Sequence, residues 1–101
     1  MNYAIKFRPE IEEDALNAYY WYEEKAVGLG EDFFRVFYAS ITEIQRNPFS
    51  HNKVYKNFRR KLTRRFPYSI YYIVQDNIII VFGLFHTARH PRRIKSKLNS
   101  R

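Results

Sequence analysis

Residues 58–89 constrain the fold of this chain more than any other stretch, because they contain its two strongest strand signals. Tyr68–Gln75 (YSIYYIVQ) is rich in β-branched and aromatic residues, and residues 78–85 (IIIVFGLF) are apolar on both faces. Asp76 and Asn77 lie between these segments and tolerate a positive φ, which predicts a tight two-residue turn. The sequence therefore predicts a β-hairpin whose second strand lies centrally in a sheet.

Residues 58–66 precede this hairpin and predict a third strand with most of the local positive charge. Strand alternation places a polar, nearly all-cationic set on one face: Arg59, Lys61, Thr63 and Arg65. Arg60 and Arg64 point to the other face. Like charges two residues apart on a strand lie about 7 Å apart and repel, so we expect a bound anion to offset the repulsion.

The first half of the chain predicts one strand and two helices. Residues 3–7 alternate as a short strand, and Pro9 with the acids after it predicts a helix that stops near Gly28. A second helix is expected from Glu31–Asp32 to Asn47, since Pro48 disfavours helical geometry at the residue before it. The apolar stripes of both helices predict an antiparallel helical hairpin with an aromatic core.

The remaining segments complete the predicted topology. Residues 48–57 are expected to form a loop, residues 86–90 leave the sheet, and Pro91 opens a short helix over residues 92–98. The predicted fold is a single α+β domain over residues 1–101, in the order β-α-α-β-β-β. Its antiparallel sheet carries the helical hairpin on one face.

Charge divides the chain into two unlike parts. Residues 1–43 hold four basic and nine acidic residues, a net of −5, whereas residues 44–101 hold fourteen basic and one acidic, a net of +13. Thirteen of those fourteen basic residues fall within residues 53–65 and 89–101. This asymmetry predicts a surface for a polyanion, either a nucleic acid or an acidic protein segment. The alternative is a basic surface that serves solubility alone.

Several classes of function are disfavoured by what the sequence lacks. It has no cysteine and hence no disulfide or thiolate metal site, which fits a cytoplasmic protein. No signal peptide and no apolar segment of about 18 residues is present, so no membrane association is expected. His86 and His90 have no nearby acid, and Pro91 argues against a helix that would join them on one face, so neither a metal nor another cofactor is expected.

The basic residues and one histidine suggest phosphate chemistry. The strand over residues 58–66 could approach the end of the strand over residues 78–85. We therefore expect one concavity to bring together Arg59, Lys61, Arg64 or Arg65, His86 and Arg89. Such cations would hold a phosphate and stabilise its transition state, while a histidine could move a proton at neutral pH. Alternatively, the cations only bind a phosphate backbone or an acidic partner, and His86 caps the strand.

Three segments resemble the RelE/ParE superfamily of bacterial type II toxins: GLGEDFF, RRFPYSIYYIV and HTARHPRR. The resemblance covers nearly the whole chain. It implies a toxin encoded beside an acidic antitoxin that binds and neutralises it. RelE-like members cut mRNA on the ribosome, and ParE-like members poison DNA gyrase.

The resemblance also implies roles for individual residues. Arg59 and Lys61 fall where RelE-like toxins carry two strand lysines, and Arg89 falls where they carry an arginine after the last strand. Ser69 replaces a second catalytic arginine, and Arg92, Arg93, Ile94 and Lys95 occupy the region of the catalytic tyrosine. His86 or His90 is expected to act as proton carrier instead. The Phe66-Pro67-Tyr68 stretch and the His86-x-x-Arg89-x-Pro91 exit are more similar to ParE-like plasmid-stabilisation proteins.

Two toxin mechanisms and one alternative follow. In the first, His86, Arg89, Arg59 and Lys61 catalyse metal-independent mRNA cleavage on the ribosome. In the second, the protein binds DNA gyrase and arrests growth without catalysis. The alternative is a non-toxic basic module for nucleic acids. Each would use the remaining basic residues for binding: Arg60, Arg64, Arg65, His90, Arg92 and Arg93.

Overall fold

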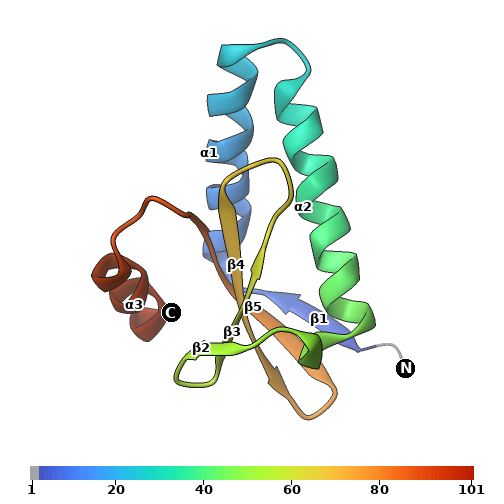
Figure 1. Ribbon diagram of the computed structural model, residues 1–101, viewed down its shortest axis with the longest axis vertical. Helices are drawn as coiled ribbons and strands as arrows, with labels where there is room; N and C mark the ends of the chain where they lie inside the picture. Colours follow the sequence, from blue (N-terminus) through green and yellow to red (C-terminus); the bar gives the residue numbers. More distant parts are fainter. Residues whose placement is uncertain (1–2) are drawn as a thin grey trace.

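A computed structural model describes residues 3–101 as one five-stranded sheet with helices on both faces (Figure 1). The strands lie in the order β1-β5-β4-β3-β2. The elements are β1 (Ala4–Phe7), α1 (Pro9–Lys25), α2 (Leu29–Arg46), the 3₁₀ helix η1 (Pro48–Ser50), β2 (Lys53–Tyr55), β3 (Phe58–Leu62), β4 (Tyr68–Gln75), β5 (Ile78–His86) and α3 (Pro91–Ser100). The predicted α+β class and the helical hairpin on one face are confirmed.

The sheet is mostly antiparallel, but one pair of strands is parallel. The β2, β3, β4 and β5 strands pair antiparallel in succession, as the sequence predicted for the last three. The β1 strand runs parallel to β5, with Ala4 opposite Ile78 and Phe7 opposite Val81. The prediction of a wholly antiparallel sheet is therefore wrong at this edge. The whole helical hairpin and three strands separate β1 from β5, and a connection of that length permits parallel pairing.

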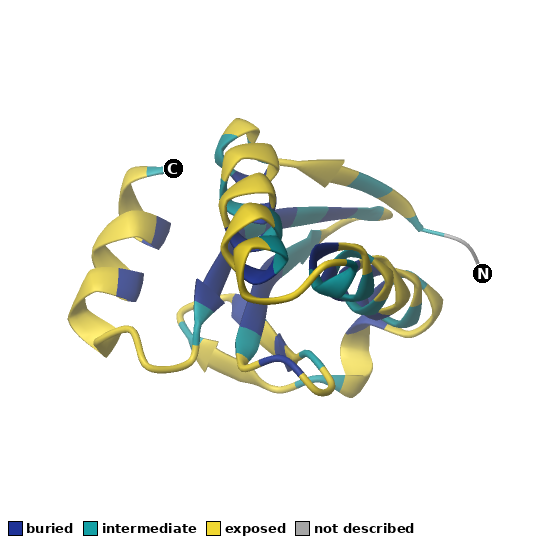
Figure 2. Cartoon of the chain, turned by 90° about the horizontal axis from the view of Figure 1, so that it is seen from above, coloured by how far each residue is buried: buried dark blue, intermediate teal, exposed yellow. Residues whose placement is uncertain are grey.

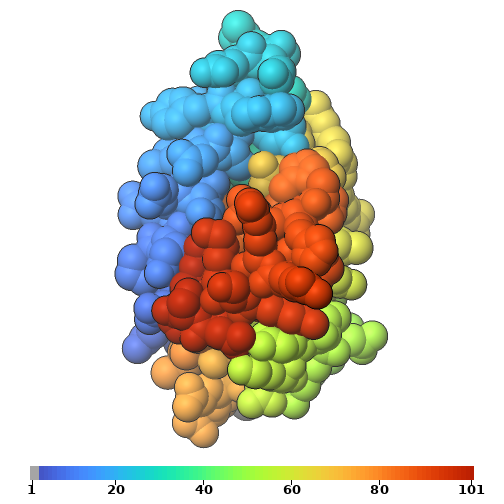
Figure 3. Space-filling view, turned by 90° about the vertical axis from the view of Figure 1, so that its left-hand side faces the viewer, coloured from blue at the N-terminus to red at the C-terminus, as the bar shows by residue number. Residues whose placement is uncertain are grey.

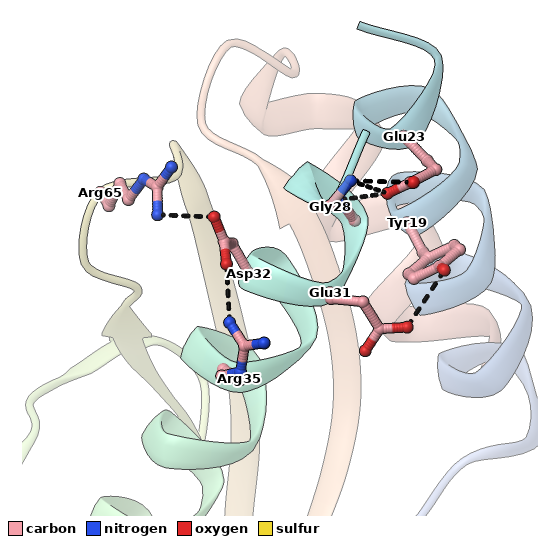
Figure 4. Close-up of polar contacts among 8 residues, drawn as sticks. Tyr19, Glu23, Gly28, Glu31, Asp32, Arg35 and Arg65 are labelled. Carbon is pink, nitrogen blue, oxygen red and sulfur yellow. Dashed lines mark hydrogen bonds and ion pairs between the residues drawn. The ribbon is translucent and has the colours of Figure 1, made fainter. Parts of the chain in front are cut away.

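The turn between α1 and α2 is tighter than the sequence predicted. The α1 helix ends at Lys25 and α2 begins at Leu29, two residues before the expected start. Gly28 adopts φ 88°, which favours glycine, and the Glu23 carboxylate accepts the N–H groups of Gly28 and Gly30 at 2.9 Å each (Figure 4). This carboxylate satisfies backbone donors at the start of α2, so the helix begins directly after Gly28.

Aromatic rings fill the core between the hairpin and the sheet. Phe33 is fully buried, and its ring centroid lies 5.6 Å from that of Tyr22, 5.4 Å from Phe66 and 5.0 Å from Tyr68. The predicted packing role of the aromatic stripe is thus confirmed. The neighbouring Phe34 is only half-buried, so Phe33 is the central ring of this core.

The predicted C-terminal helix is confirmed and is slightly longer than expected. Buried positions of α3 face the sheet in Figure 2, and they are Ile94 and Leu98, which pack with Phe85 of β5. Arg101 follows the helix and donates to the Phe82 carbonyl at 2.9 Å and to the Asp14 carboxylate at 3.2 Å. These contacts tie the end of α3 to both β5 and α1.

Two predicted segments differ from the structure. Residues 48–57 contain η1 and β2 rather than only a loop, and Tyr72 holds η1 in place by donating to the Pro48 carbonyl at 2.6 Å. The β3 strand stops at Leu62, not at residue 66. The Thr63 hydroxyl donates to the Phe66 carbonyl at 2.7 Å, and Arg65 adopts φ 66°, so the chain turns there and Phe66 enters the core.

Candidate functional site

The predicted cationic face of β3 lies against the helical hairpin. Lys61 is only 9% exposed, and its Nζ lies 2.7 Å from Oε2 of Glu43 on α2. The hydrogen bond from Lys61 lowers the pKa of Glu43. The Arg59 guanidinium donates to the His51 carbonyl at 2.7 Å and lies 5.1 Å from the Phe49 ring centroid. The repulsion expected along this strand is therefore offset within the protein itself, without a bound anion.

Arg64 and Arg65 lie in the turn after β3 and do not extend that strand. Arg65 pairs with Asp32 at the start of α2 at 3.1 Å, and Asp32 also binds Arg35 at 2.7 Å (Figure 4). Arg64 is largely exposed, and its nearest carboxylate is Glu43 at 4.0 Å. The acidic first half of the chain thus neutralises part of the basic second half.

Both candidate histidines make local backbone contacts. His86 accepts the Ala88 N–H through Nδ1 at 3.0 Å, and its ring packs 5.3 Å from that of Tyr68. His90 caps α3 by accepting the Arg92 N–H through Nδ1 at 3.1 Å. The contact of His86 matches the expectation that it caps the strand, and His90 has the same kind of role in α3.

The structure does not gather Arg59, Lys61 and His86 around one concavity. Arg59 is opposite Tyr72 and His86 is opposite Tyr68, so four residues along β4 and two strand spacings separate them. At about 3.3 Å per residue and 4.8 Å per strand, their Cα atoms lie roughly 16 Å apart. A single phosphate could not contact both side chains in this arrangement.

A groove on the opposite face of the sheet brings other cations together. It has a volume of about 500 Å³ and lies between α3 and strands β3 and β4. Its polar and aromatic lining consists of Tyr55, Arg60, Ser69, Tyr71, Thr87, Arg89 and Lys95. Figure 3 views the molecule from the α3 side, with α3 and the preceding segment across the middle and the chain around β2 and β3 beside them.

The cations of this α3 groove differ from those under the hairpin. Arg60 points to this face because Lys61 and Arg59 point to the other. Within residues 3–101, no carboxylate forms an ion pair with Arg60, Arg89 or Lys95. The groove is therefore a concave, positively charged surface, in which the ring of Tyr55 is half-buried and that of Tyr71 is buried. Of the predicted catalytic residues, only Arg89 lines it, joined by Arg60 from the predicted binding set.

Tyr55 is a potential functional residue that the sequence did not reveal. Its hydroxyl accepts the Asn99 Nδ2–H at 2.8 Å, and Lys56 donates to Asn99 Oδ1 at 2.8 Å. The Asn99 hydrogen bond, followed by Lys56 and Lys95, lowers the pKa of Tyr55. A lowered pKa means that a larger fraction of this phenol is ionised at a given pH than in an ordinary tyrosine. No sequence pattern could connect Tyr55 with Asn99, 44 residues later.

Neither a cluster of metal ligands nor a membrane-spanning helix occurs in the part of the chain that the structure describes. Residues 3–101 contain no cluster of three His, Cys, Asp or Glu side chains that could hold a metal ion. None of the helices within these residues is both long and apolar enough to cross a bilayer.

The order of elements and the mixed sheet give this chain a fold similar to that of two solved structures of bacterial toxin systems. The chain superposes with TM-score 0.69 on a chain of the chromosomal ParDE toxin–antitoxin system from P. aeruginosa, over 83% of this chain and 95% of that one at 14% identity. It superposes with TM-score 0.62 on the free state of a double arginine-to-alanine mutant of the E. coli toxin RelE, over 99% and 97% at 15% identity. No family model and no curated protein matches the sequence.

Proposed function

We propose that this chain is the toxin of a type II toxin–antitoxin system, and that it acts in the cytoplasm by binding and cleaving messenger RNA in the α3 groove. The observation that carries this proposal is the composition of the groove: Arg60, Arg89 and Lys95, which have no ion pair within residues 3–101, lie beside the half-buried ring of Tyr55. Cations hold the phosphates of single-stranded RNA, and aromatic rings stack on its bases.

The groove contains groups suited to metal-free cleavage of RNA. Arg60 and Arg89 bind the scissile phosphate and stabilise the negative charge that builds on it. Tyr55, once ionised, takes the proton of the ribose 2′-hydroxyl, whose oxygen then bonds to the adjacent phosphorus. The bond from phosphorus to the 5′ oxygen breaks, and that oxygen takes a proton from water. The products are a 2′,3′-cyclic phosphate and a 5′-hydroxyl.

The structural similarity to RelE supports the hypothesis that this chain cleaves messenger RNA. The superposition on RelE covers 99% of this chain and therefore includes α3, which forms one wall of the groove, whereas the ParDE chain matches 83%. RelE-like toxins cut mRNA on the ribosome, so we propose the ribosome as the place of cleavage.

A second candidate function is inhibition of DNA gyrase. The higher TM-score with the ParDE chain favours it, and so does the separation of His86 from Arg59 and Lys61. In this version the basic α3 surface binds the target without catalysis. Variants that change only proton transfer would then keep their toxicity.

The partner that silences the toxin is proposed to be an acidic antitoxin. Cations exposed on α3 and in the groove would attract its acidic residues: Arg60, Arg89, Arg92, Arg93 and Lys95. An antitoxin segment that covers the groove would exclude RNA. Such binding predicts that the complex is non-toxic and that its formation weakens as salt concentration rises.

The proposed function is tested with purified protein and ribosomes carrying a defined message, with cuts mapped by primer extension. We expect cuts that follow the codon phase. Arg60→Ala should reduce the cleavage rate about 10²-fold or more, because one stabilising cation of the transition state is lost. Arg64→Ala is the matched control, since Arg64 belongs to the same segment but lies outside the groove, and it should cleave normally.

Two outcomes would contradict the proposal. Equal cleavage by the Arg60→Ala and Arg64→Ala variants would remove the α3 groove from the mechanism. If the protein arrests growth on expression but cuts no message, RNA cleavage is not its activity. A supercoiling assay with purified gyrase would then test the second candidate.

A further inference from the structure

A second cavity lies beside the end of β5, on the α1 side of the sheet. Its volume is about 420 Å³, within the range of pockets that hold small organic groups. Side chains from α1, β4 and β5 line it, together with one from the segment after β5: Asp14, Asn17, Trp21, Tyr68, His86 and Arg89. The proposed RNA chemistry uses only Arg89 among these.

Exposed aromatic surface forms part of this cavity. Trp21 is 54% exposed, although tryptophan is usually well buried in a folded protein. The Lys25 ammonium lies 4.5 Å from its ring centroid, which places a positive charge close to the ring. Tyr68 is half-buried and packs edge-on against His86 at 5.3 Å. Such rings are surfaces on which unstacked bases of single-stranded nucleic acids stack.

Polar atoms with unused hydrogen-bonding capacity lie beside these rings. The Asn17 amide makes no hydrogen bond within residues 3–101, and Asp14 uses only Oδ2, which accepts from Arg101 at 3.2 Å. The Nδ1 atom of His86 is occupied by the Ala88 N–H, which leaves Nε2 available. A carboxylate oxygen, an amide and an imidazole nitrogen can together hydrogen-bond to a base edge.

Arg89 connects this cavity with the α3 groove, because it lines both. A phosphate bound by Arg89 in the groove would leave the neighbouring nucleotide of the same strand at the mouth of the second cavity. The two surfaces would then act on one strand, the groove on its backbone and the cavity on one base.

We propose that the cavity of Asp14, Asn17, Trp21, Tyr68 and His86 is a nucleobase subsite for single-stranded RNA, with guanine preferred. Guanine presents two donors on its Watson–Crick edge, which a carboxylate can accept, and an oxygen that an amide can bind. The subsite rests on the proposed RNA-directed function and deepens it, since it would give the toxin a preference for the base beside the bound phosphate.

Trp21 permits a direct test because it is the only tryptophan in the sequence. Its fluorescence is followed while the protein is titrated with short single-stranded RNAs that have equal numbers of phosphates and cannot be cleaved. We expect guanine-containing RNA to quench Trp21. An RNA with one abasic position should bind about 5–150-fold more weakly, as expected for the loss of one stacked base. Inorganic phosphate should not quench.

A variant pair tests the polar part of the subsite. Asn17→Ala removes an exposed amide that makes no hydrogen bond to any of residues 3–101, so folding should be unaffected. The preference for guanine over the other bases should fall. Gln75→Ala is the matched control, since it removes an exposed amide at the far end of β4. It should leave both the affinity and the base preference unchanged.

The outcomes separate this inference from the proposed function. If RNA binds, by anisotropy of a labelled strand, but Trp21 fluorescence does not change or does not depend on the base, the subsite is overturned while the groove stands. If guanosine monophosphate quenches but RNA does not, the cavity takes a free nucleotide and the placement on a strand is wrong. If neither readout detects RNA, both proposals fail.

Discussion

The two faces of the sheet carry cations from the same strand but place them in opposite surroundings. On the hairpin face, Lys61 is buried and paired with Glu43 of α2. On the α3 face, its neighbour Arg60 lines an open groove and has no ion pair within residues 3–101. Paired and buried charges position elements of the fold, whereas unpaired cations in a groove remain available to bind an anion. From this contrast we expect Lys61 to stabilise the fold and Arg60 to take part in the proposed function.

The largest expected effect on the α3 face comes from removing the proposed proton acceptor of the groove. Tyr55→Phe keeps the ring but deletes the hydroxyl, so cleavage of ribosome-bound message should fall about 10²–10⁴-fold. RNA affinity and thermal stability should change little, because the aromatic ring at this position of β2 is kept. The measurement is the single-turnover cleavage rate of the variant, at concentrations above the dissociation constant of its complex with RNA.

Tyr38→Phe is the control for that prediction. Tyr38 is 57% exposed and belongs to α2, away from the α3 groove, so its hydroxyl should not affect the rate. If Tyr55→Phe cleaves as fast as wild type, another group takes the 2′-hydroxyl proton. His86→Gln would then be the next variant to measure.

The pH dependence of cleavage sharpens the role of the groove further. The hydrogen bond from Asn99 is the largest cause that lowers the pKa of Tyr55. If Tyr55 acts as base, the rate should rise with pH until this group is ionised, at a pH below the ordinary tyrosine value of about 10. Asn99→Ala removes the hydrogen bond and raises the pKa of Tyr55. The rising limb should therefore move to higher pH, and activity at neutral pH should fall.

The control for the pH profile comes from the same helix. Ser96 is exposed on α3 and makes no hydrogen bond to Tyr55, so Ser96→Ala should keep the wild-type profile. An Asn99→Ala profile that overlays that of Ser96→Ala would show that the rate does not depend on ionisation of Tyr55.

On the hairpin face, the expected effects are on stability and not on cleavage. Glu43→Gln leaves the Lys61 ammonium buried without its carboxylate. The free energy of unfolding should fall by about 1–2 kcal/mol at pH 7, a value discounted because the Glu43 side chain is 39% exposed. Glu24→Gln, on the exposed side of α1, is the control and should be neutral. Urea denaturation measures both, and both variants should retain cleavage.

Acid should remove the same contribution. Lys61 lowers the pKa of Glu43 in the folded protein below its ordinary value of 4.5. The pair therefore stabilises the fold above that ordinary value and loses its effect as pH falls through the folded pKa. The stability difference between wild type and Glu43→Gln should shrink below this range. A difference that persists in acid would mean that the lost charge pair is not its cause.

The sequence predicted elements well where the deciding signal is local. The bounds of β4 were predicted correctly because alternation and turn residues lie within the segment itself. Alternation also assigned Arg59 and Arg60 to opposite faces. Strand alternation could not predict which side of β3 is exposed to solvent. That depends on where α2 packs and on Glu43, which lies 18 residues before Lys61. The contact of Tyr55 with Asn99 joins residues 44 apart and likewise has no local signal.

The smallest expected effect concerns the turn that sets α2 against the sheet and so determines what covers Lys61. Glu23 accepts the N–H groups of Gly28 and Gly30, so Glu23→Ala leaves both donors without a protein partner. The loss should be about 0.5–1 kcal/mol, as for other helix N-terminal caps, because water can replace the carboxylate at the half-buried Gly28. Thermal unfolding measures it, with Glu24→Ala as the control. A loss of several kcal/mol would mean that the turn holds the whole hairpin in place, and the hairpin face would then depend on one carboxylate rather than on its aromatic core.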